Sequence, residues 1–290
     1  MTRNNKDKTI AIFLKAPIII AVVLLALFII ILFARALPLL SSGKFIEVFT
    51  TSTWLPHDGK FGMLPFIIGT ISVTILTLII AVPIGLASSI YLSEFAPKKL
   101  RNIAMSIIDI LSAIPSIIYG ACGVIVCIPA VKWLGTQLNI STSGRCLLTA
   151  SIVLAAMIIP VIIAISKEVF ASIPNEARES LLALGATRWE TTRYVVIKLA
   201  FPGIIAAVIL GMSRAFGETM AVMMVAGSSI VSVPKLFEPI YTLPALIADK
   251  YGEMMSVEMY EAALMTAALV LMIVVAVANL IAYFIMQKLK

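Results

Sequence analysis

Long apolar runs separated by short charged clusters dominate this chain. Six such runs, two of them interrupted by one or two charges, extend between Lys15 and Arg35, Lys60 and Glu94, Arg101 and Lys132, Arg145 and Lys167, Lys198 and Lys235, and Glu261 and Lys288. About 20 helical residues cross a hydrocarbon core about 30 Å thick, and each run provides that length. The strands of a transmembrane barrel are much shorter. The pattern therefore predicts an all-α membrane protein with six transmembrane helices.

The composition supports a membrane protein and changes the interpretation of the charge. Of 290 residues, 61% are hydrophobic and 13% are charged, whereas soluble domains have roughly 25% charged residues. The formal net charge of +7 would suggest nucleic acid binding in a soluble domain. In a membrane protein, basic residues instead mark cytoplasmic loops. We therefore expect membrane lipid around the chain and no nucleic acid partner.

The distribution of Lys and Arg predicts the orientation. With the amino terminus in the cytoplasm, 14 of these residues fall on the inner side and 7 on the outer side. This bias favours both termini in the cytoplasm, in a multi-pass protein of the cytoplasmic membrane. Apolar residues continue past Arg35, and the first run is expected to stay as a transmembrane helix. Residues 1–64 are thus expected to form a tail, the first transmembrane helix and an outer loop.

The residues that usually hold metals are sparse. Cys122, Cys127 and Cys146 show no CxxC spacing, and His57 is the single histidine. We expect these cysteines to pack as small apolar residues and predict no metal site. The sequence also contains no G-x-x-x-x-G-K-[ST] motif to cradle ATP. The chain is therefore not expected to hydrolyse ATP or to act as an enzyme.

The basic stretch at residues 172–203 predicts a helix, a turn and a second helix. Pro174 suits the start of the first helix and Gly185 its end. Thr187, with a glutamate three residues later, forms a capping box that opens the second helix. Leucines lie along the first helix, including Leu182. The stretch is either a folded loop packed on the membrane surface or a docking surface for a cytoplasmic partner.

The same stretch resembles the EAA loop of ABC importer permeases. The pattern of that loop is E-A-A, three residues, G, and then nine residues before I-x-L-P. Glu179 and Gly185 keep the spacing. Ser180 and Leu181 replace the two alanines, and Lys198 stands where the proline would be.

Three further segments strengthen the resemblance. They read FIIGTISVTILTLIIAVPIGLASSIYLSEFAP, IPSIIYG and SRAFGETMAVMMVAG. Together with the loop they resemble the membrane permeases of phosphate-specific ABC transporters, and the GETMAV form resembles the C-type subunit. The resemblance extends from about Phe66 to Tyr283. It implies the type-1 ABC importer permease fold, with a five-helix core at 65–287 and a cytoplasmic coupling loop at 172–203.

The resemblance also implies a function and partners. The chain would be a permease subunit that translocates inorganic phosphate by alternating access, within an ATP-driven importer. Its partners would be a second permease subunit in a heterodimer, two ATP-binding subunits that carry ATP and Mg, and an extracytoplasmic phosphate-binding protein docked on outer segments such as 228–260. No cofactor would bind this chain itself. The ATPase-coupling residues would be Glu179, Leu182, Gly185, Ala186 and Thr187.

Alternatives remain open at this point. A permease of the same fold could serve another oxyanion, such as molybdate, tungstate or sulfate, because arginine binds any of them. The chain could also be the A-type phosphate permease partner. An ion-coupled secondary transporter or a membrane enzyme is a third class. We see neither inverted repeats nor an interfacial cluster of histidines or carboxylates that would favour that class.

Three charges fall inside the predicted transmembrane helices. Arg214 and Glu218 are four residues apart, which predicts one helical face, and Asp109 lies in the third run, shortly before Pro115 and Ser116. A central charge costs about 2.5–3.5 kcal/mol on insertion scales, so these side chains should face the bundle interior or water. They either form a structural salt bridge or line an anion path.

The anion path has a chemical rationale. A guanidinium matches an oxyanion through two parallel hydrogen bonds. A carboxylate can accept the proton that phosphate still carries at neutral pH, whereas sulfate has no proton to donate. The expected substrate path consists of Arg214, Glu218, Asp109 and Ser116.

Overall fold

The computed structural model describes residues 3–41, 45–253 and 259–288. Apart from one two-stranded hairpin and one isolated bridge, the regular secondary structure of the described part is helical. Its elements are α1 (Arg3–Leu40), α2 (Phe45–Thr50), β1 (Trp54–Leu55), η1 (Pro56–Asp58), β2 (Lys60–Phe61), α3 (Leu64–Ile90), η2 (Tyr91–Phe95), α4 (Lys98–Ala113), α5 (Ser116–Cys122), η3 (Gly123–Cys127), α6 (Ile128–Gln137), α7 (Leu147–Ala171), α8 (Asn175–Ala183), α9 (Arg188–Thr191), η4 (Thr192–Val196), α10 (Ile197–Gly217), α11 (Met220–Ala226), α12 (Leu243–Lys250) and α13 (Tyr260–Lys288).

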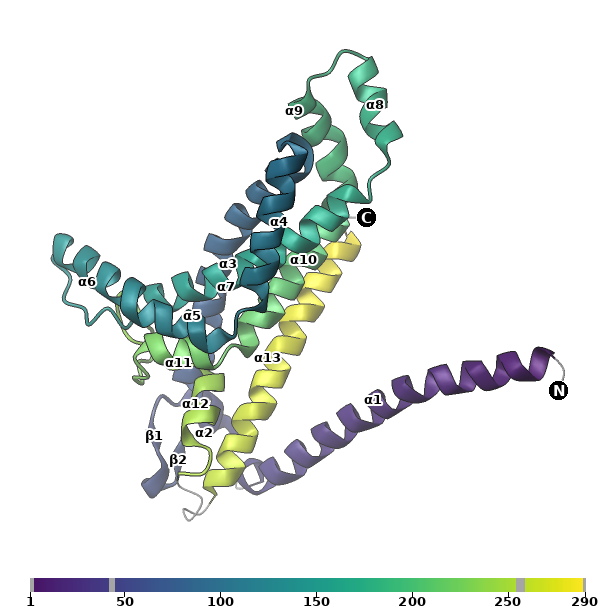
Figure 1. Cartoon of the computed structure of the whole chain (residues 1–290). Coiled ribbons are helices and arrows are strands. Elements are labelled where there is room, and N and C mark those ends of the chain that lie inside the picture. Colours follow the sequence, from purple (N-terminus) through teal and green to yellow (C-terminus); the bar gives the residue numbers. More distant parts are fainter. Residues whose placement is uncertain (1–2, 42–44, 254–258, 289–290) are drawn as a thin grey trace.

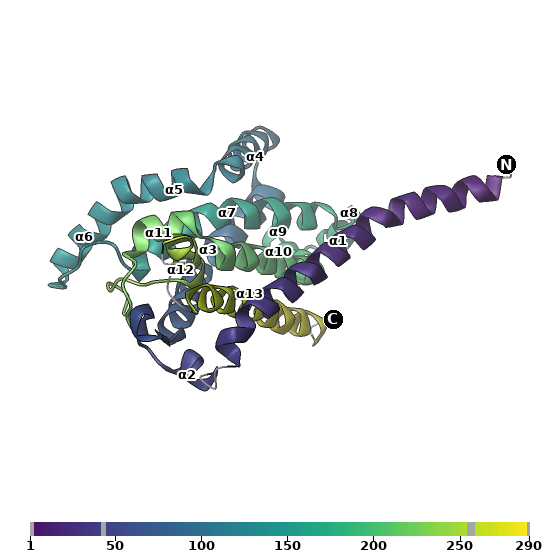
Figure 2. The ribbon, with the colours of Figure 1, turned by 90° about the horizontal axis from the view of Figure 1, so that it is seen from below.

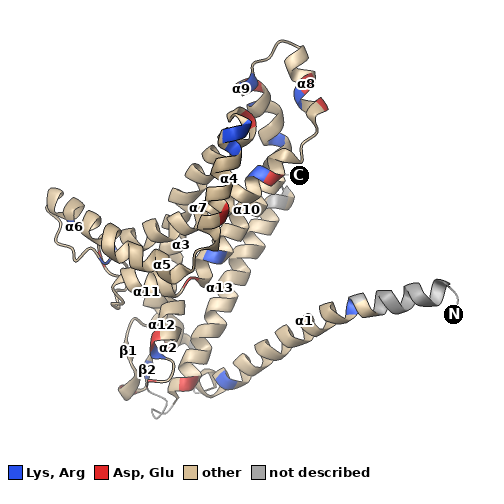
Figure 3. Cartoon of the chain, in the orientation of Figure 1, with Lys and Arg blue, Asp and Glu red and all other residues tan. Residues whose placement is uncertain are grey.

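Six helical segments of the described part are long and apolar enough to cross a membrane, which confirms the predicted number. They are Lys15–Leu40, Leu64–Phe95, Ser116–Gln137, Leu147–Ala171, Arg188–Gly217 and Tyr260–Ile285. Charged residues gather at the end of the bundle that carries α8 and at the end that carries α12, and few lie between them (Figure 3). We call these the α8 end and the α12 end.

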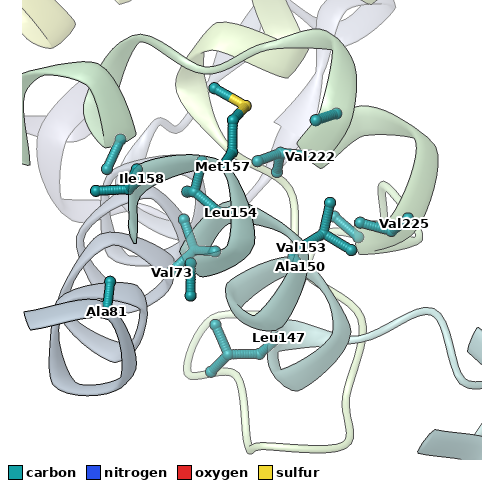
Figure 4. Close-up of a cluster of buried hydrophobic side chains, with 14 of the residues drawn as sticks. Val73, Ala81, Leu147, Ala150, Val153, Leu154, Met157, Ile158, Val222 and Val225 are labelled. Atoms are coloured by element: carbon teal, nitrogen blue, oxygen red, sulfur yellow. The ribbon is translucent and has the colours of Figure 1, made fainter. Parts of the chain in front are cut away.

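Helix α7 forms the centre of the bundle (Figure 1). In its most apolar window 61% of the residues are buried, against 6% in α1. The α7 side chains Leu154 and Ile158 pack with Val73 of α3 and Val222 of α11 in the main core (Figure 4). Because α7 is apolar on all sides, it can bury every face against its neighbours. The middle of α7 therefore marks the middle of the bundle, and the depth of other residues along the bundle is given relative to it.

Helix α1 contacts the rest of the chain mainly through its last turns. Leu32 and Ala36 pack against Leu269 of α13, and Arg35 forms an ion pair with Glu261 at 3.1 Å. The earlier turns diverge from the bundle in both ribbon views (Figures 1 and 2). The contact places the end of α1 beside the start of α13, as the alternating path of the predicted helices requires.

The α12 end carries the hairpin, an element that the sequence pattern did not predict. Trp54 of β1 packs edge-on against Phe61 and Phe66, with ring centroids 5.6 and 5.3 Å apart. Trp54 also contacts Tyr260, and Phe66 contacts Tyr241. This aromatic cluster attaches the short strands to the ends of α3 and α13.

The third predicted transmembrane helix was wrong in its extent. The run from Arg101 is two elements: α4 ends at Ala113, and the membrane-crossing segment begins at Ser116. Ile114 and Pro115 between them are extended, with ψ of 129° and 140°. Proline lacks a backbone N–H and disfavours the helical conformation in the residue before it, so the helix stops there.

Candidate functional site

The predicted turn in the coupling loop is present. Helix α8 ends at Ala183, and Gly185 adopts a positive φ of 87°. The Gly185 N–H donates to the Leu182 carbonyl at 3.0 Å, and the Ala186 N–H donates to the Leu181 carbonyl at 3.3 Å. These two bonds satisfy carbonyls that the helix end leaves free, and the left-handed conformation suits glycine.

The predicted capping box is also present. The Thr187 N–H donates to Glu190 Oε2 at 2.7 Å, and the Glu190 N–H donates to Thr187 Oγ1 at 3.2 Å. The helix that it opens differs from the prediction, because α9 continues through η4 into α10. The turn at Gly185 is therefore joined directly to the fifth membrane-crossing segment, and a displacement of this turn acts on α10.

The loop exposes large apolar side chains at the α8 end. Leu184 is 83% exposed, Trp189 53% and Leu182 41%. Of the other predicted coupling residues, Glu179 and Thr187 are exposed and Ala186 is half-buried. An exposed apolar ridge rimmed by polar residues is typical of a protein-binding surface. The ridge does not pack on the rest of the described chain, so packing on the membrane surface and docking of a partner both stay predictions.

One residue of the loop that sequence reasoning missed forms an ion pair with the bundle. Arg178 Nη2 lies 3.1 Å from Glu94 Oε1, and the two side chains are only 18% and 12% exposed. Their separation of 84 positions hid the pair from any local pattern. The pair joins α8 to η2, at the end of the second membrane-crossing segment.

The depth of Arg214 follows from the packing of α10 on α7. A Cβ at Gly211 would lie 2.9 Å from Ile158 Cγ2, so Gly211 is directly opposite Ile158. Ile158 lies at the middle of α7, which runs from Leu147 to Ala171. Arg214 is three residues further along α10, about 4.5 Å along the helix axis. It therefore lies near mid-bundle, as expected.

Arg214 has no hydrogen-bond or ion-pair partner among the described residues, and it is half-buried. On α5, the Tyr119 hydroxyl donates to the Leu111 carbonyl at 2.8 Å. Ser116, one turn before Tyr119, begins α5 and is also half-buried. An unpaired guanidinium at this depth is costly unless water, an anion or another chain meets it.

Glu218 does not share a helical face with Arg214, so that expectation was wrong. Helix α10 ends at Gly217, and Glu218 is extended, with φ −73° and ψ 124°. No ion pair joins the two residues in the described part. Glu218 Oε1 instead accepts the Ala221 N–H at 3.1 Å, at the start of α11. A carboxylate at that position caps the free amides of the helix.

Asp109 lies outside the six membrane-crossing segments, contrary to the prediction. It belongs to α4 and is exposed, while its neighbour Ile108 packs with Leu92 and Ile163. Helix α4 is amphipathic and packs on α7 and η2. No hydrogen bond or ion pair in the described part joins Asp109 to Arg214. The structure thus places Asp109 on α4 and does not bring it together with Arg214.

The α12 end has a polar network of its own. Helix α12 begins directly after Thr242. The Tyr241 hydroxyl donates to Asp249 Oδ2 at 2.5 Å, and Lys250 Nζ lies 3.3 Å from the same oxygen. The Tyr241 hydrogen bond, with the help of Lys250, lowers the pKa of Asp249. Burial, followed by the Asp249 hydrogen bond, raises the pKa of Tyr241.

The described residues contain no group of three or more His, Cys, Asp or Glu side chains that could hold a metal ion. Cys146 is buried and Cys127 half-buried, as packing residues would be, whereas Cys122 is exposed. The polar features that remain are the coupling loop, the pair that attaches it and the unpaired Arg214.

Comparisons with known proteins agree with this geometry. Over 209 residues the chain is 43% identical to the probable ABC transporter permease protein YqgH of Bacillus subtilis, covering 71% of this chain and 66% of that one. It is 34% identical to the phosphate transport system permease protein PstC of Xylella fastidiosa, covering 99% and 94%. A probable PstC of Methanocaldococcus jannaschii is 35% identical, covering 92% and 90%.

Solved structures show the same fold. A chain of a bacterial alginate ABC transporter superposes with a TM-score of 0.69 at 14% identity, covering 98% of this chain and 96% of that one. A chain of the MetNI methionine ABC transporter, in an inward-facing conformation, gives 0.58 at 21% identity, covering 77% and 93%. The architecture is thus that of type-1 ABC importer permeases. Residues 81–290 match a family model as well, and the chain belongs to the family of inner membrane components of binding-protein-dependent transport systems.

Proposed function

We propose that this chain is one of two permease subunits of an ATP-driven importer for inorganic phosphate. The observation that carries the proposal is the similarity, over nearly the whole chain, to permeases named for phosphate transport in bacteria and an archaeon. The excess of Lys and Arg on one side supports an orientation with the α8 end and both termini in the cytoplasm.

The coupling loop is where ATP-binding subunits would dock. Leu182, Leu184 and Trp189 present an apolar ridge that a groove on an ATPase subunit can bury. Glu179 and Thr187 lie exposed nearby. Since α9 continues into α10, closure of the two ATPase subunits on ATP would move the fifth membrane-crossing segment directly. The ATP and Mg would be held by those subunits.

Arg214 would meet phosphate in the membrane. Its guanidinium is unpaired near mid-bundle, and its fork of N–H donors matches two oxygens of a tetrahedral oxyanion. Ser116, at the start of α5, would donate a hydroxyl hydrogen bond to the same anion. Glu218, one residue beyond α10, would accept the phosphate proton. Selection of phosphate over other oxyanions would begin on an external phosphate-binding protein docked at the α12 end.

Assembly and stimulation of ATP hydrolysis test this proposal. The chain is co-expressed with its neighbouring transport subunits, and the complex is purified in nanodiscs. Native mass spectrometry should show one copy of this chain, a second permease subunit and two ATPase subunits. Binding protein loaded with phosphate should stimulate ATP hydrolysis. The same binding protein incubated with sulfate or molybdate instead should not stimulate it. Stimulation by sulfate or molybdate alone would identify the chain as a permease for another oxyanion.

A further inference from the structure

Helix α8 has almost no hydrophobic attachment of its own. None of its nine residues is buried. Ile173, just before the helix, packs with Phe170, Val196 and Ala200, and the turn at Gly185 joins the other end to α9. Between these two points, apolar packing holds the helix only weakly, because α8 buries no side chain. Polar contacts must fix its position.

Arg178 supplies those contacts. Its Nη2 and Nε donate to the two oxygens of Glu94, at 3.1 and 3.3 Å. Its Nη2 also donates to the Phe170 carbonyl at 2.7 Å, and its Nη1 donates to the Ile173 carbonyl at 2.6 Å. Phe170 belongs to the last turn of α7, whose carbonyls lack partners within the helix. One guanidinium therefore joins α8 to the ends of both α3 and α7.

The acceptor side of this pair is itself fixed. The Ser93 hydroxyl donates to Glu94 Oε1 at 3.0 Å. Arg101 of α4 donates from Nε to the Leu92 carbonyl at 2.7 Å and from Nη2 to the Ser93 carbonyl. Helix α4 thus fixes the backbone of η2 around Glu94. The Ser93 hydroxyl orients the Glu94 carboxylate independently of Arg178.

The pair has the features of a stabilising ion pair. It is bidentate, and both side chains are less than one fifth exposed. It borders a polar cavity of 350 Å³ lined by Ser93, Glu94, Arg101, Lys167, Ala171, Asn175 and Arg178. A polar cavity of this size can hold water, which reduces the cost of desolvating the charges. The Phe170 and Ile173 carbonyls and Asn175 Oδ1 accept the remaining N–H donors of Arg178.

We propose that Arg178 is a positioning residue that fixes the coupling helix to the cytoplasmic ends of α3 and α7. A displacement of α8 by an ATPase subunit then moves these two helices as one unit with the loop, in addition to the direct link from α9 to α10. The inference rests on the proposed docking of ATPase subunits at the loop. It assigns Arg178 to the transmission of motion and leaves the docking surface to the exposed ridge.

Variants of Arg178 separate transmission from docking. Arg178→Gln removes the ion pair, Arg178→Lys keeps the charge without the planar fork, and Arg193→Gln removes an exposed arginine of the same loop as a matched control. In proteoliposomes with the complete complex, Arg178→Gln should retain the ATPase subunits and hydrolyse ATP. Phosphate transported per ATP should fall about tenfold, within the range of coupling between sites in one protein. The ratio of phosphate transported per ATP in Arg178→Lys should lie between that of Arg178→Gln and that of wild type, and the ratio in Arg193→Gln should match wild type.

A distance measurement tests the attachment itself. In a background with the three native cysteines replaced by serine, spin labels are placed at Ser180→Cys on α8 and Tyr91→Cys on η2, both exposed positions. The label distance should stay constant between nucleotide-free and ATP-bound states in wild type, and it should broaden in Arg178→Gln. An unchanged distance and an unchanged transport ratio in Arg178→Gln would overturn the proposal.

The two proposals fail differently. Loss of the ATPase subunits from Arg178→Gln would overturn the positioning role, because Arg178 would then belong to the docking surface. If Gly185→Arg left the ATPase subunits bound and uptake intact, docking at the loop would be refuted whatever the result for Arg178.

Discussion

Replacing Gly185 by alanine isolates the backbone contribution of the turn between α8 and α9. Gly185 has a φ of 87°, and a Cβ added there would meet no atom within 4 Å. Steric contact therefore contributes nothing, and the effect is the intrinsic cost of a left-handed conformation, about 1–2 kcal/mol for a residue with a Cβ. If ATPase subunits bind only the formed turn, their affinity should fall roughly 5- to 30-fold.

The assay is a titration of the purified permease subunits in nanodiscs with the ATPase subunit, read as a Kd. Gly185→Asn should lose less affinity than Gly185→Ala, because asparagine adopts the left-handed conformation more readily. Gly59→Ala is the matched control: Gly59 also has a positive φ, of 65°, and open space around it, but it lies at the α12 end. It should bind the ATPase subunit with the wild-type Kd.

Two results would refute this reasoning. If Gly185→Ala bound the ATPase subunit within twofold of wild type, the turn would not be part of the docking geometry. If Gly59→Ala weakened binding as much as Gly185→Ala, the effect would reflect general destabilisation. A tighter Kd for the ATPase subunit in Gly185→Ala than in Gly185→Asn would also contradict a backbone origin of the effect.

Three further predictions concern the membrane charges and the α12 end. Arg214→Gln should reduce phosphate uptake at least about tenfold, because charged hydrogen bonds are lost, and Arg214→Lys should retain more uptake. Equal uptake in wild type and both variants would make the role of Arg214 structural. Glu218→Gln should keep the bond from the Ala221 N–H and wild-type thermal stability but weaken discrimination against sulfate, whereas Glu218→Ala should also lose about 1 kcal/mol of stability as a cap is removed. The lowered pKa of Asp249 stabilises the fold above its unfolded pKa of about 3.9, and this stabilisation is lost as pH falls through the lower folded value. The unfolding temperature, followed by tryptophan fluorescence, should therefore fall below about pH 4, and Tyr241→Phe should reduce this pH dependence of stability. An unchanged pH profile in Tyr241→Phe would contradict the prediction.

The membrane-crossing segments were predictable because their signal is local and large. A run of about 20 apolar residues has few alternatives to a transmembrane helix. The turn at Gly185 and the cap at Thr187 were predictable for the same reason: each depends on residues within five positions of one another. The structure confirms the number of segments in the described part, the turn and the cap.

The sequence-based predictions were wrong where apolar content continued through a helix break. Counting from charge to charge placed Asp109 inside a transmembrane helix, but the extended backbone at Ile114 and Pro115 ends α4 first. The four-residue spacing of Arg214 and Glu218 assumed a continuous helix, whereas α10 ends at Gly217. A change of backbone conformation at a single residue overrides helical periodicity.

Long-range contacts could not be predicted from one sequence. The pair of Glu94 and Arg178 joins residues 84 positions apart, and the hairpin of β1 and β2 depends on packing of Trp54 against Phe66 and Tyr260. The ion pair has no local sequence signal, and the turn residues Asp58 and Gly59 of the hairpin do not predict what the hairpin packs against. The attachment of the coupling loop therefore became visible only in three dimensions.

ATP-driven uptake of radiolabelled phosphate tests the central claim most directly. Proteoliposomes contain this chain with its partner permease and ATPase subunits, ATP inside, and the binding protein outside. The proposed function predicts phosphate accumulation that requires ATP and binding protein and that excess sulfate or molybdate does not inhibit. Accumulation should be lost in Arg214→Gln while the complex stays assembled. Accumulation of phosphate without the ATPase subunits, or of sulfate or molybdate in place of phosphate, would contradict it.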